Sequence, residues 1–391
     1  MNKIKIYHFY NGSGGGVLSV IKNLLKFSLS DKIENHVIYA INQNLFPKYI
    51  IEPVEGAVTQ QVYFYSPNNN FYNSCKQLNK LLPDVKAIII AHDWFELGMV
   101  HNLGLANKVI YILHGNYDYY YDLAIKHQKV IDAFVCISPI IFNNLKLKIT
   151  HESEKIFYLN YPVKNFQIKN KNKDHFNIFY AAGNLNDDNK QFNTVIKVAE
   201  NICKMLPNVF FTIAGGGFTE TEFFKLWPSD LKKNVNFLGL IENEKLLHIL
   251  TEQHVFLLPS LLEGFPVSLV EAMKAGAVPL VTNWDGAVDE LITAGVTGFY
   301  FKARAVNDYV DCIERLHADR VMLNTIASNA SVRVNALFNP YVNTRKFEEI
   351  FLSVAAKKLD KKNASKVYGS RLDHQYIPNA ITLFIRNLKK N

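Results

Sequence analysis

Two glutamates eight positions apart, Glu263 and Glu271, are the residues of this chain best suited to chemistry. The apolar run 255–258 predicts a buried strand, and Pro266 suits the first position of a helix, where its missing N–H costs nothing. Glu271 would then lie inside the helix, about 7–8 Å along the axis from Pro266. That separation is on the scale of a nucleotide sugar, so one carboxylate could hold a ribose and the other the sugar. Ligands of open α/β sheets bind at such strand ends.

A lysine and a group of glycines follow two other predicted strands. Lys190 closes the polar loop 183–190, directly after the predicted strand 176–181. A lysine at that edge could clamp a diphosphate, although a solvated loop lysine explains its position equally well. The glycines at 215–217 follow a second strand and would let a ligand approach the backbone closely.

The glycine-rich segment 11–16 follows the first predicted strand. Its backbone N–H groups could face a phosphate, and a tight strand-to-helix connection is the alternative. The segment is not a dinucleotide fingerprint, because Val17 occupies the third glycine position, and no Walker lysine follows.

Two histidines stand at the ends of predicted strands. His92 precedes Asp93, and His114 precedes Gly115, which leaves room for a ligand beside the backbone. Imidazole there could bond a sugar hydroxyl, whereas a structural hydrogen bond is the more ordinary role of His92. Tyr117 and the tyrosines at 119–121 could stack on sugar rings or simply pack in the core.

Strands and helices alternate along the chain, which predicts an α/β protein with doubly wound parallel sheets. The pattern restarts near residue 175, after the polar stretch 164–175, so two Rossmann-like halves follow one another. The predicted strands are 3–9, 36–41, 62–65, 87–91, 108–113, 133–137, 176–181, 209–214, 235–238, 255–258, 278–281 and 298–300.

Length and composition agree with that organisation. A chain of 391 residues, 49% hydrophobic and 20% charged, is typical of a globular protein with two domains. Its four cysteines form no CxxC pair, which argues against a metal site or a disulfide framework and favours a reducing cytoplasm. The first residues do not resemble a signal peptide, and no stretch is long enough to span a bilayer.

The net charge of +8 is uneven, since residues 357–391 hold nine basic and two acidic residues. Such a tail either solubilises the protein or attracts it to an anionic membrane surface. No nucleic-acid module accompanies the charge, so we expect no nucleic-acid partner.

The run from Glu263 to Met273 resembles the Glu-x7-Glu signature of retaining glycosyltransferase family 4, the GT-B type also called glycosyl transferases group 1. The resemblance continues through other segments: the first glycine loop, Asp93, His114-Gly115, Ser138, Asn160–Val163, Lys190, Gly215, Gly217, Gly239, Gly286–Glu290 and Gly298. It implies two Rossmann-like domains facing across a cleft. Asn184 departs from the family, which usually carries Arg there, and Ala287 replaces a usual glycine.

The resemblance also implies roles for individual residues. Glu271 would bind the ribose, Glu263 would contact the donor sugar and phosphates, and His114 would sit near the reacting sugar. Glu263, His114 and Lys190 would be catalytic. The donor-binding set would be Gly15, Gly16, Gly183, Asn184, Lys190, Gly215, Gly217, Glu263, Gly264, Phe265, Pro266, Val267 and Glu271. The acceptor-binding set would be His92, Asp93 and Tyr117.

The resemblance implies domains at 1–168, on the acceptor side, and 169–356, on the donor side, with a basic tail at 357–391 that includes a helix returning to the first domain. The expected activity is metal-independent, retaining transfer of a hexose-type sugar from a nucleoside diphosphate to a glycan or glycolipid, as in surface polysaccharide or lipopolysaccharide assembly. No cofactor is expected, and the location would be the cytoplasm, including the inner face of the membrane. A nucleotide-sugar epimerase or hydrolase of the same fold, or a silent sugar-binding protein, is the alternative.

Overall fold

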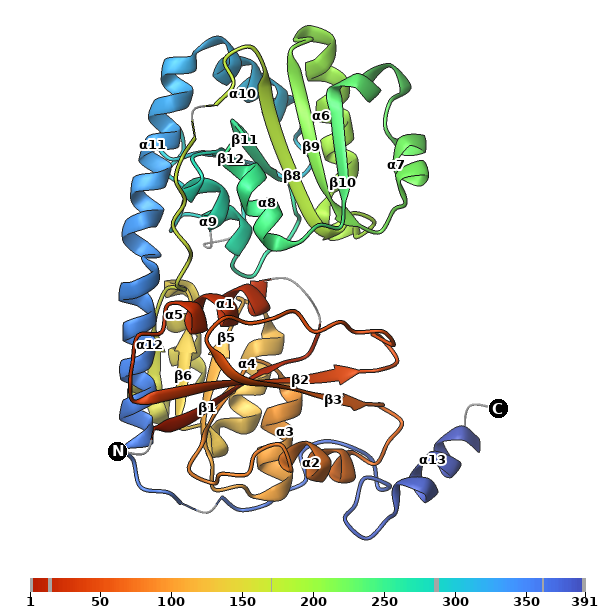
Figure 1. The fold of residues 1–391 in the computed structure, drawn as a ribbon, viewed down its shortest axis with the longest axis vertical. Coiled ribbons are helices and arrows are strands. Elements are labelled where there is room, and N and C mark those ends of the chain that lie inside the picture. The colour runs from red at the N-terminus through yellow and green to blue at the C-terminus, as the bar shows by residue number, and fades with distance from the viewer. Residues whose placement is uncertain (1–2, 13–15, 170, 285–287, 361, 389–391) are drawn as a thin grey trace. The chain divides into compact units, whose positions relative to one another are not determined.

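The computed structural model describes residues 3–12, 16–169, 171–284, 288–360 and 362–388 (Figure 1). The chain folds into two compact units. Unit 1 comprises Met1–Pro162 together with Pro340–Asn391, and unit 2 comprises Val163–Asn339. Each unit is a parallel sheet covered by helices (Figure 1), which confirms the predicted α/β class.

Unit 1 contains a seven-stranded sheet in the order β3-β2-β1-β4-β5-β6-β7. All neighbouring strands are parallel, and the central ones are buried on both faces, as apolar runs in parallel sheets require. The strands are β1 (Ile4–Tyr10), β2 (Ile33–Asn42), β3 (Ala57–Tyr65), β4 (Ile88–Ala91), β5 (Lys108–Leu113), β6 (Ala133–Cys136) and β7 (Ile156–Tyr158). The helices are α1 (Gly16–Lys26), α2 (Phe71–Asn79), α3 (Trp94–Leu103), α4 (Asp118–His127), α5 (Pro139–Lys148), α12 (Pro340–Ala355) and α13 (Asn379–Leu388).

Unit 2 contains a six-stranded parallel sheet in the order β10-β9-β8-β11-β12-β13. The strands are β8 (Phe176–Asn184), β9 (Val209–Gly216), β10 (Val235–Gly239), β11 (Val255–Leu258), β12 (Val278–Thr282) and β13 (Phe299–Phe301). The helices are α6 (Phe192–Met205), α7 (Glu220–Leu226), α8 (Asn243–Leu250), α9 (Val267–Lys274), α10 (Val306–Ala318) and α11 (Arg320–Leu337).

The structure divides the chain at other points than the sequence predicted. The boundaries fall after Pro162 and after Asn339, not after residues 168 and 356. Helix α12 belongs to unit 1 because its apolar side packs there: the ring of Phe351 lies edge-on against His8 of β1, and Asn343 donates to the Tyr161 carbonyl. An amphipathic helix shows in sequence that it is buried, but not against which sheet.

The segment after α12 packs on unit 1 and ends in α13, which lies beside α2 (Figure 1). In the described ranges, no helix combines the length and apolar content needed to cross a bilayer.

Candidate functional site

An ion pair stands at the carboxyl edge of the unit 2 sheet. Lys190 ends a short 3-10 turn after β8, and Glu263 lies in the loop between β11 and α9. Because β8 and β11 are neighbours, the two loops meet, and the Lys190 ammonium lies 2.8 Å from a Glu263 carboxylate oxygen. The two side chains are 26% and 14% exposed, so solvent and a ligand can still reach the pair.

Several hydrogen bonds fix the two loops against each other. The Asn189 amide donates to the Leu262 carbonyl at 2.9 Å and accepts from the Leu262 N–H at 2.9 Å. The Tyr180 hydroxyl, on β8, donates to the Lys190 carbonyl at 2.8 Å. The position of the Lys190–Glu263 pair is therefore set by the sheet rather than by long flexible side chains alone.

Helix α9 begins one residue later than predicted. Pro266 is its N-cap, with no side-chain cap, and Val267 is its first residue. Glu271 lies within the helix as expected and is only 6% exposed. Phe265 is buried against the ring of Phe338, so its side chain serves packing while its backbone stays in the loop. The first turn of α9 thus carries amide groups that suit an anion.

The glycines at the carboxyl edge of the unit 2 sheet differ in how closely their surroundings pack. A side chain at Gly215 would lie 2.2 Å from the Ala182 carbonyl oxygen, and one at Gly217 would lie 2.1 Å from the Asn184 amide oxygen. Both glycines therefore let the two loops pack closely. Gly183, by contrast, has open space around it. The Asn184 side chain accepts from the Asn186 N–H at 3.0 Å, so it shapes its own turn instead of supplying the charge of the usual Arg.

Replacement of Glu271 by glutamine should remove a pH dependence of unit 2 stability. Burial raises the pKa of Glu271 from 4.5 to about 8, so the folded protein holds a proton that the unfolded chain releases between these values. The stability that this group contributes is present below pH 4.5 and is lost as the pH rises toward 8. We expect the variant to match the wild type near pH 5 and to unfold at a higher temperature near pH 8.5. Unfolding followed by the fluorescence of the buried Trp227 and Trp284 measures this, and an equal difference at both pH values would contradict it.

Unit 1 brings two of the predicted histidines together. His92 Nδ1 lies 2.7 Å from His114 Nε2, and His114 Nδ1 lies 2.5 Å from the Tyr161 hydroxyl. Burial lowers the pKa of His114 to about 3, and burial followed by the charge of His114 lowers the pKa of His92. Both rings are therefore neutral near pH 7. Because both nitrogens of His114 are engaged within the protein, its predicted contact with the sugar would have to be through the ring edge.

Asp93 is the acidic centre of a small hollow in unit 1. Its carboxylate accepts from Asn11 and from the Tyr119 hydroxyl, and it caps α3 together with Glu96. Burial, and then the charge of Asp93, raises the pKa of Glu96 to about 8. The hollow is lined by Phe9, Tyr10, Asn11, Val17, His92, Asp93, Glu96, Tyr119 and Tyr120.

The hollow includes His92 and Asp93 from the predicted acceptor set but not Tyr117, which precedes α4 and stacks on Tyr120. Sequence reasoning missed Asn11 and Glu96. Asp-x-x-Glu is a helix-capping pattern that could have pointed to Glu96, whereas Asn11 comes close only through the sheet. Gly16 begins α1, and Gly15 lies outside the described residues.

Two other features carry no chemistry of their own. A shallow hollow beside α7 is lined by Glu220, Thr221, Phe224, Lys225 and Lys232, none of which belongs to the Lys190–Glu263 pair. Among the described residues, no three His, Cys, Asp or Glu side chains gather as metal ligands. Lys190 and the first turn of α9 remain the groups at the carboxyl edge best placed for an anionic ligand.

Comparisons with known proteins concern the same part of the chain and its fold. Residues 163–333 match the family model of glycosyl transferases group 1, which covers most of unit 2 and both members of the Lys190–Glu263 pair. The solved structure of the pneumococcal O-GlcNAc transferase GtfA in complex with UDP and GlcNAc is similar, with a TM-score of 0.71, 12% identity, and coverage of 91% of this chain and 100% of that one. The fold is therefore that of the GT-B enzymes.

Several curated relatives match in sequence, and two of them are compared with this chain below. The UDP-Gal:alpha-D-GlcNAc-diphosphoundecaprenol alpha-1,3-galactosyltransferase of Escherichia coli is 25% identical over 154 residues, which are 39% of each chain. The N,N'-diacetylbacillosaminyl-diphospho-undecaprenol alpha-1,3-N-acetylgalactosaminyltransferase of Campylobacter jejuni is 24% identical over 235 residues, or 58% of this chain and 55% of that one. The chain thus aligns with about two fifths to one half of these relatives.

Proposed function

We propose that this protein is a retaining glycosyltransferase of family 4 that moves a hexose-type sugar from a nucleoside diphosphate to a hydroxyl of a glycan or glycolipid. The observation that carries the proposal is the Lys190–Glu263 pair, 2.8 Å long, at the carboxyl edge of the unit 2 sheet within the family-matched region. A cation positioned there meets the charge that develops on a departing diphosphate.

Lys190, Glu263, Glu271 and the first turn of α9 have separate roles in that reaction. The Lys190 ammonium neutralises the diphosphate, and the first turn of α9 offers backbone N–H groups to the same phosphates. Glu263 holds Lys190 in place and accepts from the hydroxyls of the donor sugar. Glu271, one turn into the helix, accepts from the ribose diol. The protein supplies charge and position, and no residue of unit 2 needs to act as a nucleophile.

The acceptor would bind in the hollow of unit 1. Asp93, with Asn11 and Tyr119 on its carboxylate, presents acceptor oxygens to a sugar hydroxyl. The acceptor oxygen would attack on the face that the phosphate leaves, and a phosphate oxygen would take its proton, so the anomeric configuration is retained. His92 and His114 are neutral and act by hydrogen bonding and packing, not as cations.

The names of the two relatives suggest the substrates to try first. Both act on an acceptor linked to diphosphoundecaprenol, and the first of them uses UDP-Gal. We therefore propose a UDP-sugar donor and a lipid-linked acceptor, with the protein working from the cytoplasm at the inner face of the membrane.

A donor screen tests the proposal. Calorimetry with UDP-, GDP- and dTDP-sugars identifies the donor, and proton NMR of the anomeric signal follows it with and without an undecaprenyl-diphosphate-linked acceptor. We expect acceptor-dependent release of the nucleoside diphosphate and a product with the donor's anomeric configuration. Consumption of the donor without an acceptor would favour the epimerase or hydrolase, and tight binding with no turnover would favour a silent sugar-binding protein.

A further inference from the structure

The segment after α12 is fixed to unit 1 by polar contacts. The Lys362 ammonium donates to the carbonyls of Asn107 at 2.7 Å and Val130 at 2.6 Å and pairs with Asp132 at 3.1 Å. Further along, the Tyr368 ring lies edge-on against Trp94, and its hydroxyl bonds His127 at 2.8 Å. The segment therefore follows a defined path to α13.

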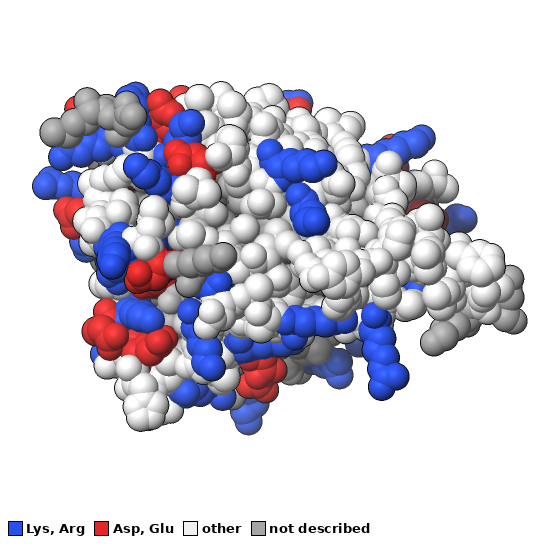
Figure 2. All heavy atoms as spheres, turned by 90° about the horizontal axis from the view of Figure 1, so that it is seen from below, with Lys and Arg blue, Asp and Glu red and all other residues white. Residues whose placement is uncertain are grey.

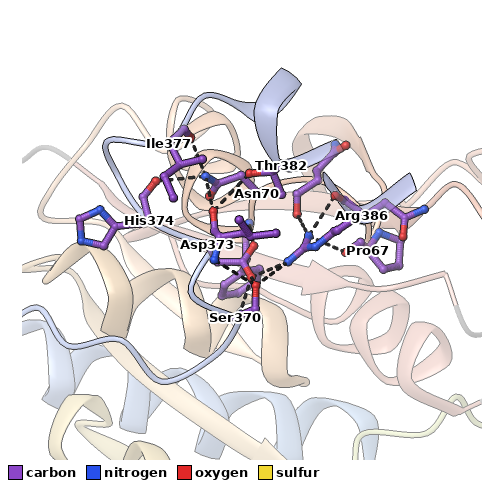
Figure 3. Close-up of polar contacts among 12 residues, drawn as sticks. Pro67, Asn70, Ser370, Asp373, His374, Ile377, Thr382 and Arg386 are labelled. Atoms are coloured by element: carbon purple, nitrogen blue, oxygen red, sulfur yellow. Dashed lines mark hydrogen bonds and ion pairs between the residues drawn. The ribbon is translucent and has the colours of Figure 1, made fainter. Parts of the chain in front are cut away.

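The approach to α13 is organised by Asn70, just before α2 (Figure 3). The Asn70 amide donates to three carbonyls of the tail, those of Leu372 at 3.1 Å, His374 at 3.0 Å and Ile377 at 2.7 Å. In return, Asn379 at the start of α13 accepts from the Asn70 N–H at 2.7 Å. One buried side chain thus sets the turn that precedes the helix.

A second contact holds the far end of α13. Arg386 pairs with the buried carboxylate of Asp373 at 2.5 Å and donates to the carbonyls of Asn68 at 2.9 Å and Asn69 at 2.6 Å (Figure 3). Asp373 also accepts from the Phe71 N–H at 2.6 Å. The helix is consequently fixed in rotation as well as in place.

The rotation of α13 is the reverse of that expected for a helix packed on a protein core. Thr382 is its only buried residue, and Thr382 and Arg386 face unit 1. Ile381, Phe384 and Leu388 are 49%, 66% and 61% exposed, and their spacing of three and four places them on one side of the helix. An amphipathic helix in a globular protein normally buries that side.

The tail that ends in α13 carries a net positive charge in its sequence. Residues 357–391 hold nine basic and two acidic residues, and one of the two acids, Asp373, is used by Arg386. Figure 2 shows the molecule from below, where separate Lys and Arg side chains are scattered over a face that is largely uncharged. Lys389 and Lys390 follow Leu388 in the sequence.

These features favour an anionic lipid surface over a second copy of the chain. A symmetric pair of copies would bring two basic tails together, which costs electrostatic energy, whereas anionic headgroups complement the charge. An apolar side on a helix whose sequence continues directly into two lysines, Lys389 and Lys390, is also typical of helices that lie in the plane of a membrane interface.

We propose that α13 is an interfacial helix that inserts Ile381, Phe384 and Leu388 among the headgroups of an anionic bilayer. Unit 1 would then rest on the membrane through this helix, with its rotation set by Asn70 and Arg386. This gives the proposed lipid-linked acceptor a place of contact, but attachment to lipid does not require sugar transfer, so the two proposals can fail separately.

The test uses the full chain and sedimentation with vesicles of phosphatidylcholine containing about 30% phosphatidylglycerol, which gives their surface a negative potential. We expect the wild type to sediment with these vesicles and not with pure phosphatidylcholine. The variant Ile381→Ser/Phe384→Ser/Leu388→Ser should bind at least about tenfold less, with an unchanged unfolding temperature, because three apolar side chains no longer enter the bilayer. The matched control Leu226→Ser/Val321→Ser/Val332→Ser removes three exposed apolar residues of helices in unit 2 and should bind as the wild type does.

A single replacement reports on insertion directly. The emission of Phe384→Trp should shift to shorter wavelength on addition of the anionic vesicles, and that of Val321→Trp should not. Full vesicle binding by the serine variant, or an unshifted Phe384→Trp, would overturn the proposal. So would a wild type that is dimeric without lipid while the serine variant is monomeric, since α13 would then pair copies of the chain. Transfer to a water-soluble acceptor, assayed in parallel, shows whether the enzyme itself is active.

Discussion

Replacement of Glu263 by alanine should abolish sugar transfer while the protein stays folded. Without the carboxylate, the Lys190 ammonium loses its partner at 2.8 Å, and the donor sugar loses an acceptor for its hydroxyls. Loss of one positioned group that meets transition-state charge costs about 10²–10³ in kcat, and here two functions are lost at once. The measurement is kcat/KM with the donor found in the screen.

The free energy of unfolding of Glu263→Ala shows whether its loss of transfer is due to unfolding. The pair is partly exposed, with side chains 26% and 14% accessible, so its removal should change the free energy of unfolding by no more than about 1 kcal/mol. The matched control is Glu252→Ala, which removes the partner of Lys169 from another pair 2.8 Å long in unit 2. Glu252 lies before β11, at the opposite end of the strand from Glu263. Near-normal transfer by Glu263→Ala would contradict the assignment of this residue.

A double-mutant cycle measures how the effects of Glu263 and Lys190 on transfer depend on each other. If Glu263 acts mainly by holding Lys190, the double variant Glu263→Ala/Lys190→Ala should be little worse than the more damaging single variant. If the carboxylate also contacts the sugar, the losses should approach additivity. This cycle tells a positioning role from direct contact with the donor.

Replacement of Lys274 by methionine should destabilise unit 2 by about 3 kcal/mol, because it leaves the buried carbonyls of Val163 and Phe338 without a donor. Lys274 ends α9 and is 1% exposed. Its ammonium donates to the Val163 carbonyl at 2.6 Å, the Asn165 side chain at 2.8 Å and the Phe338 carbonyl at 2.8 Å. One side chain thus joins the start and the end of unit 2, three residues after Glu271.

Chemical unfolding followed by tryptophan fluorescence measures the loss of stability of unit 2. Trp227 and Trp284 are buried in unit 2, whereas Trp94 belongs to unit 1. The control Lys245→Met removes a lysine that is 71% exposed and should leave the free energy of unfolding within about 0.5 kcal/mol of the wild type. Equal midpoints for the two variants would show that the three contacts of Lys274 contribute little.

Local sequence patterns predicted most of the strands but not their extent or order. The apolar run 255–258 coincides with β11, since four consecutive buried residues flanked by a proline leave little choice. Residues 57–61 of β3 were missed because Thr59, Gln60 and Gln61 are polar, and β7 was missed because it has only three residues. Pairing with β2 and β6 makes these segments strands, and such pairing is not encoded locally.

The candidate site was also predicted only in part from local sequence patterns. The Glu-x7-Glu run and the position of Lys190 after a strand were visible in the sequence, but their 2.8 Å contact depends on β8 and β11 being neighbours. The contact of His92 with His114 and that of Asn11 with Asp93 likewise depend on strand order in unit 1. The glycines at 215 and 217 were read as room for a ligand, whereas each also lets two loops pack closely.

By itself, the sequence determined the α/β class, the two-part organisation and the identity of the charged residues at strand ends, because these follow from local periodicity and residue chemistry. Only the tertiary structure decided which charges meet, that Pro340–Asn391 returns to unit 1, and that α13 turns its apolar side outward. The reason is that these outcomes depend on contacts between residues far apart in the chain. Arg386 shows this most directly, since its contacts with Asp373 and with the carbonyls of Asn68 and Asn69 set the rotation of a helix whose own amphipathic pattern predicts that the opposite side is buried.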